Sequence, residues 1–120
     1  MKILVVDDSK AMRMIVVRTL RQAGFSGHDV VEAENGKEGL EKTRELKPDL
    51  VLSDWNMPEM TGIEFLKALR GSGDSTPFCF VTSEGSEEMR AMASAAGALG
   101  LIAKPFTDDA FRDTLGAVVS

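Results

Sequence analysis

Short apolar runs alternate along the chain with longer stretches in which apolar and polar residues are mixed. Five runs rich in Val, Ile, Leu or Phe have the length of strands, namely Ile3–Val6, Asp29–Ala33, Leu50–Ser53, Phe78–Val81 and Gly100–Ala103. Ile3–Val6 is apolar throughout, as expected for a strand covered on both faces. Between the runs, apolar residues recur at the spacing of one helical face. The pattern predicts five strands, each followed by a helix.

Capping residues and chain breakers predict where these helices begin and end. Ser9, Thr61, Ser86 and Thr107 can cap helix starts, and Asn35-Gly36-Lys37-Glu38 resembles a capping box. Gly24 and Pro48 follow the first two helices and stop them. The predicted inner faces are Met12, Ile15, Val16, Leu20 and Ala23; Ile63, Leu66 and Leu69; Met89, Met92, Ala93 and Ala96; and Phe111, Leu115 and Val118.

Strands that alternate with helices imply right-handed βαβ crossovers and a parallel sheet with helices on both faces. We therefore expect one α/β domain over residues 1–120, a doubly wound, flavodoxin-like five-stranded sheet in the order 2-1-3-4-5. No repeat or interdomain linker interrupts the pattern.

Composition and charge exclude several classes of function. No apolar run approaches the roughly 20 residues of a membrane-spanning helix, and the N-terminus lacks a signal-peptide pattern. The net charge is −5, without the clustered Lys and Arg that nucleic-acid binding needs. A single cysteine, Cys79, excludes an internal disulfide and fits a reducing cytoplasm. We expect a cytoplasmic protein with neither membrane insertion nor nucleic-acid binding.

Polar residues follow four of the predicted strands. Asp7 and Asp8 follow the first, Asp54 the third, Thr82 the fourth and Lys104 the fifth. The carboxyl ends of parallel strands meet at one edge, so these side chains should converge. Two carboxylates ~5 Å apart repel by roughly 3 kcal/mol at an effective dielectric of 20. The acids therefore need a proton or a cation, and hard oxygen ligands suit Mg²⁺.

This arrangement indicates phosphoryl transfer to Asp54. A carboxylate can accept a phosphoryl group covalently, and Mg²⁺ and Lys104 would offset the charge of that group from two sides. Thr82 can donate a hydrogen bond to a phosphoryl oxygen, and Asn56 can offer its backbone carbonyl to the metal.

At these residues the sequence resembles a response-regulator receiver domain. The resemblance extends over nearly the whole chain, through Val5–Ser9, Asp54–Pro58, Met60–Gly62, Thr82-Ser83 and Lys104–Phe106. It implies Asp54 as phosphoacceptor, Asp7 and Asp8 as acidic Mg²⁺ residues, Thr82 as switch hydroxyl and Lys104 as phosphate contact. It also implies a phosphohistidine on a sensor histidine kinase as donor and a cis Lys104–Pro105 bond.

Within the family the chain is most similar to the stand-alone chemotaxis regulators, the CheY-like group. The resemblance implies that Asn56 and Glu84 occupy the two positions that, in this family, tune hydrolysis of the acyl phosphate. One departure is Leu101, where receivers usually carry Tyr or Phe. The resemblance implies a monomer that contacts a downstream target, such as a flagellar motor switch, through its fourth helix, fifth strand and fifth helix. Such a protein catalyses its own phosphorylation and dephosphorylation but acts as a signalling switch.

Alternatives remain both within the receiver family and outside it. The chain could be a stand-alone phosphorelay receiver or a receiver domain cut from a larger regulator. A haloacid-dehalogenase-like phosphatase also uses an aspartate after a strand, but needs a second acid two residues later, where Asn56 stands. A phosphorylation-independent binding module would not require the complete set of acids, Thr82 and Lys104.

Overall fold

The computed structural model describes residues 1–25, 27–103 and 106–116. Strands and helices alternate strictly along these residues: β1 (Lys2–Val6), α1 (Lys10–Gln22), β2 (Asp29–Ala33), α2 (Gly36–Leu46), β3 (Leu50–Ser53), α3 (Gly62–Gly71), β4 (Phe78–Thr82), α4 (Glu87–Ala95), β5 (Gly100–Ala103) and α5 (Asp108–Leu115). None of these helices combines the length and the apolar character that crossing a membrane requires.

The five strands form one parallel sheet in the order β2-β1-β3-β4-β5, which confirms the predicted fold class and topology. The central pair is β1 and β3, and their register places Val6 beside Ser53. The chain therefore leaves these two strands side by side, with Asp7 following one and Asp54 following the other. This register brings the predicted acids after β1 and β3 to adjacent strand ends.

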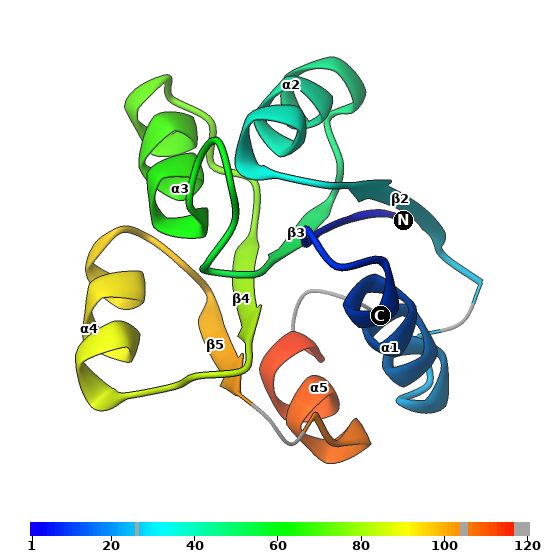
Figure 1. Ribbon diagram of the computed structural model, residues 1–120. Coiled ribbons are helices and arrows are strands. Elements are labelled where there is room, and N and C mark those ends of the chain that lie inside the picture. The colour runs from blue at the N-terminus through cyan, green and yellow to red at the C-terminus, as the bar shows by residue number, and fades with distance from the viewer. Residues whose placement is uncertain (26, 104–105, 117–120) are drawn as a thin grey trace.

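Helices cover both faces of the sheet, as Figure 1 shows, with α1 and α5 on one face and α2, α3 and α4 on the other. Successive strand residues point to opposite faces, so Ile3 and Val5 pack toward α1 and α5, whereas Leu4 and Val6 pack toward the other three helices. Each apolar layer is continuous under its helices. The uninterrupted apolar character of the central strands is thereby explained.

The helix starts follow the predicted capping chemistry. The predicted cap side chains each accept a hydrogen bond from the amide three residues further on, at Ser9, Asn35, Thr61, Ser86 and Thr107. At Thr61 the capping box is complete, because Glu64 bonds back to the Thr61 amide. At Asn35 only the first half of the box forms as predicted. The Glu38 carboxylate there pairs with Lys42 Nζ at 3.1 Å.

The predicted inner faces need two corrections. Met92 was placed inward on α4 but is 44% exposed, because only Ala93 is buried on that short helix. Phe65 was not predicted to be internal, yet it is fully buried and packs edge-on against Phe78. The prediction for Val118, like that of a cis Lys104–Pro105 bond, lies outside the described residues.

Candidate functional site: an acidic pocket at the strand ends

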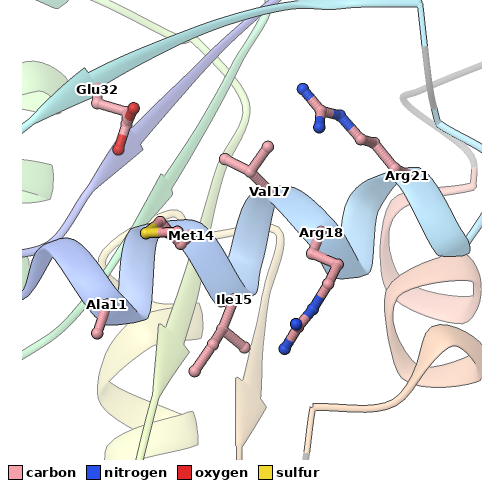
Figure 2. Close-up of a pocket in the computed structure, with 7 residues that line it drawn as sticks. All are labelled: Ala11, Met14, Ile15, Val17, Arg18, Arg21 and Glu32. Atoms are coloured by element: carbon pink, nitrogen blue, oxygen red, sulfur yellow. The ribbon is translucent and has the colours of Figure 1, made fainter.

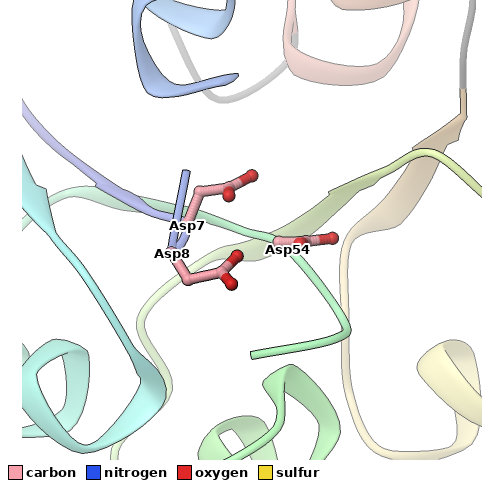
Figure 3. Close-up of side chains that lie close together, drawn as sticks. All are labelled: Asp7, Asp8 and Asp54. Carbon is pink, nitrogen blue, oxygen red and sulfur yellow. The ribbon is translucent and has the colours of Figure 1, made fainter. Parts of the chain in front are cut away.

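Three aspartates lie together where β1 and β3 end. The ligand atoms of Asp7, Asp8 and Asp54 lie within 4.8 Å of one another, and Figure 3 shows the side chains projecting from the two neighbouring strand ends. The sheet hydrogen bonding continues beyond the strands, since the Asp54 amide donates to the Val6 carbonyl at 2.9 Å. The predicted convergence of the three acids is confirmed.

Backbone amides orient two of the three carboxylates. Ser9 N–H donates to Asp7 Oδ1 at 2.8 Å, and Trp55 N–H donates to Asp54 Oδ1 at 2.7 Å. Both amides belong to the loops that leave the strands. The same turns that end the strands therefore set the direction of the acids.

The carboxylates are costly to ionise together. Asp7 is only 4% exposed, and burial raises its pKa to about 6, against the opposing hydrogen bond from Ser9 and with further raising from Asp54 and Asp8. Burial likewise raises the pKa of Asp54, while the Trp55 amide lowers it and the charge of Asp8 raises it. A bound cation would relieve the same repulsion that a proton relieves.

Thr82 is the last residue of β4 and is 1% exposed. Its Oγ accepts a hydrogen bond from the Glu84 amide at 3.3 Å. The same hydroxyl lowers the pKa of Asp54, as does the backbone amide of Asn56. The hydroxyl thus connects the acid cluster to the loop before α4. Lys104, the remaining predicted site residue, lies outside the described residues.

Gly62 supports the loop that carries Asp54. Its amide donates to the Trp55 carbonyl at 2.8 Å. A Cβ at this position would lie 2.1 Å from the Asp54 carbonyl oxygen and 2.9 Å from the Phe80 ring. No side chain other than hydrogen fits there without movement of the Asp54 backbone. In the sequence, Gly62 stands out only as the last residue of the Met60–Gly62 motif.

Arg13 is a site residue that the sequence reasoning missed. It is 7% exposed on α1, and its Nη1 donates to the backbone carbonyl of Asp7 at 2.7 Å. A signal was present in the pattern, because Arg13 lies three and seven residues before Val16 and Leu20, on the same buried face of the helix. A charged residue at an inward position requires a partner.

A groove of about 480 Å³ lies along α1, lined by Ala11, Met14, Ile15, Val17, Arg18, Arg21 and Glu32 (Figure 2). None of these residues belongs to the acid cluster. The cluster lies instead at the carboxyl ends of β1 and β3, where Asp8 is exposed and Asp54 is half-buried. This exposure suits a carboxylate that must react with a group on another protein.

Comparison with known proteins agrees with this geometry. Residues 3–116 match the family of response regulator receiver domains. The chain therefore belongs to the response-regulator receiver family. Members of this family are activated by phosphorylation within two-component signalling. They interact with kinases and with downstream targets, and they generally bind Mg²⁺ at an acidic pocket.

Similar proteins include chemotaxis regulators. Chemotaxis protein CheY1 of Helicobacter pylori is 38% identical over 122 residues, which cover 99% of this chain and 97% of the relative. The CheY homolog of Campylobacter jejuni is 40% identical over 124 residues, covering 99% and 92%. The structure of chemotaxis response regulator CheY4 of Vibrio cholerae superposes with a TM-score of 0.82 at 40% identity, covering 98% and 97%. The chain is thus homologous to the CheY group of phosphorylation-activated regulators.

Proposed function

We propose that Asp54 is the phosphoacceptor and that it takes the phosphoryl group from a phosphohistidine of a sensor histidine kinase. The supporting observation is its place among three acids at the end of the central strand, with one carboxylate oxygen held by the Trp55 amide. The P–O bond to a carboxylate oxygen forms as the P–N bond to the donor imidazole breaks, and the imidazole leaves. Phosphoryl transfer of this kind depends mainly on positioning and charge.

Asp7, Asp8 and Asp54 fit a site for Mg²⁺, together with the backbone carbonyl of Asn56. The fit rests on the donor set, because clustered carboxylates are hard oxygen ligands, and burial together with the charge of neighbouring acids raises the pKa of two of them. When bound, the ion supplies positive charge beside the phosphoryl oxygens. Lys104 is proposed to contact the same oxygens from the end of β5.

The switch and the output follow from the site. The Thr82 hydroxyl would donate a hydrogen bond to a phosphoryl oxygen and move toward Asp54, and the Glu84 amide bonded to it would move with it. The proposed output surface is formed by α4, β5 and α5; the loop of Glu84 leads into α4 and lies against β5. The relatives named as chemotaxis proteins favour a flagellar motor switch as the target.

We further propose that the protein is a cytoplasmic monomer and that residues 1–120 form a single receiver domain.

The experiment is phosphorylation by acetyl phosphate with Mg²⁺, followed by intact mass measurement. The wild-type protein should gain the mass of one phosphoryl group, in a linkage that is stable to acid and labile to base, and Asp54→Asn should gain none. Asp29→Asn, which changes an exposed acid at the other end of β2, is the matched control. Labelling of Asp54→Asn at the wild-type rate would refute the assignment.

A further inference from the structure

The buried side chain of Arg13 donates a hydrogen bond to the backbone between Asp7 and Asp8. The guanidinium of Arg13 lies under α1, where its Nη1 donates to the Asp7 carbonyl at 2.7 Å and its Nε donates to Glu32 Oε1 at 2.9 Å. Arginine can make both bonds because its donors form a rigid planar fork. The Arg13 side chain is 9% exposed and that of Glu32 48% exposed, so the ion pair spans the boundary between the core and solvent.

These bonds hold the peptide group that joins Asp7 to Asp8. Asp7 lies one residue beyond β1, and its amide donates to the Ala33 carbonyl of β2 at 3.1 Å. Its carbonyl is held by Arg13. A peptide group is planar, so fixing the Asp7 carbonyl also fixes the direction of the Asp8 amide and Cα. Asp8 is exposed, so its position depends chiefly on this backbone.

Glu32 anchors the arrangement to the sheet. It precedes Ala33 on β2, pairs in register with Val5 of β1, and extends its carboxylate toward α1 (Figure 2). The hydrogen bonds therefore form a closed path from Asp7 to Arg13, to Glu32, along β2 to Ala33, and back to Asp7. Three segments of the chain are locked together at the point where the acids emerge.

We propose that Arg13 is a positioning residue for the Mg²⁺ site, acting through the Asp7–Asp8 backbone, with Glu32 as its anchor. The inference rests on the proposed function, in which Asp7 and Asp8 bind the metal. Arg13 itself touches neither the metal nor the phosphoryl group. Its loss would let the Asp7–Asp8 peptide rotate and separate the carboxylates, which must approach one ion together.

The test is titration with MgCl₂, followed by calorimetry and by the fluorescence of Trp55, which adjoins Asp54. Arg13→Met keeps the apolar stem and removes both hydrogen bonds, and it should weaken Mg²⁺ binding about 10- to 100-fold, as loss of outer-shell partners does elsewhere. Arg13→Lys keeps the positive charge, but its ammonium group can reach only one of the two acceptors at a time. This variant should therefore recover part of the lost Mg²⁺ affinity. Acetyl phosphate labelling of Arg13→Met should return to near the wild-type rate at saturating Mg²⁺.

Two controls separate positioning from general destabilisation. Thr19→Ala removes a buried hydroxyl that donates to the Ile15 carbonyl on the same helix, and it should lower stability while leaving Mg²⁺ affinity unchanged. Arg18→Met changes an exposed arginine on α1 and should change neither. If Arg13→Met fails to fold, Arg13→Lys carries the test, with an expected loss of about 3- to 10-fold.

Each outcome decides a different claim. Affinity within twofold of wild type in the folded Arg13 variants would overturn the role of Arg13 while leaving the metal site standing. An equal loss in Thr19→Ala would also overturn it, since the effect would then be unspecific. Absence of Mg²⁺ binding by the wild-type protein itself would remove the proposed metal site, and the inference with it. Weakened binding confined to the Arg13 variants supports the proposal.

Discussion

Replacing Asp7 by Asn should stabilise the metal-free protein, and the gain should grow with pH. Asp7 is buried, yet its carboxylate must ionise beside two other acids. An Asn Oδ1 can still accept the hydrogen bond from the Ser9 amide, so the substitution removes the charge and keeps the contact. The burial and repulsion that raise the pKa of Asp7 would then no longer act.

The pKa of Asp7 rises from 3.8 to about 6. Because the folded value lies above the unfolded one, the stabilising contribution of the protonated group is complete below about pH 4 and disappears as the pH rises through the folded value. At 1.36 kcal/mol per pKa unit, ionisation costs up to about 3 kcal/mol at pH 8 and about 1 kcal/mol at pH 4.5. Burial is the larger cause of the shift, and water at the exposed Asp8 screens the part that comes from repulsion, so these figures are upper values.

The assay is urea unfolding in EDTA at pH 4.5, 6 and 8, with the free energy of unfolding compared between Asp7→Asn and wild type. Asp29→Asn, at an exposed position far from the cluster, should show no such trend. Added Mg²⁺ should stabilise the wild type at pH 8 and close most of the gap. A gain independent of pH, or a loss of stability at pH 8, would contradict the reasoning.

Four further outcomes are expected. Mg²⁺ at tenfold over its dissociation constant should stabilise the wild type by about 1.4 kcal/mol in thermal unfolding, and Asp8→Asn should abolish most of that gain. Thr82→Ala should suppress the backbone NMR shifts of α4, β5 and α5 on addition of beryllofluoride and Mg²⁺, whereas Thr82→Ser should retain them; a full response in Thr82→Ala would show another route. Leu101→Ala, at a position 6% exposed, should cost about 2–5 kcal/mol in urea unfolding, against under about 1.5 kcal/mol for Leu101→Met. Gly62→Ala should cost about 1–3 kcal/mol and slow labelling of Asp54, because its Cβ would meet the Asp54 carbonyl.

The architecture and the acid cluster were predictable because both follow from periodicity. Alternating strands and helices leave few topologies for a parallel sheet, and the carboxyl ends of neighbouring parallel strands necessarily adjoin. Asp7 and Asp54 therefore had to meet once β1 and β3 were neighbours. The caps at Ser9 and Thr61 were equally local, since a cap depends on only four consecutive residues.

Residues whose role depends on side-chain reach were not predictable in this way. Helical spacing placed Met92 inward, but α4 buries so narrow a stripe that a long side chain at its edge extends into solvent. Arg13 shows the reverse case, because it is a charged residue in an inner position and the apolar pattern of the helix does not include it. The acceptors that satisfy it, the Asp7 carbonyl and Glu32, lie 6 and 19 residues away along the chain.

Leu101 illustrates what a sequence motif can predict and what depends on packing in the folded protein. Its difference from the usual aromatic residue was visible in the sequence, but its surroundings were not. Arg90 of α4 donates through Nη1 to the Leu101 carbonyl at 2.8 Å, and a Cβ on Gly85 would lie 2.6 Å from Ala103 Cβ and 3.2 Å from Leu101 Cδ2. The loop after Thr82 thus lies directly on β5, and an arginine ties β5 to α4. Gly85 leaves room for this contact between the loop and the Leu101 side chain, a feature that neither hydrophobic spacing nor a family motif encodes.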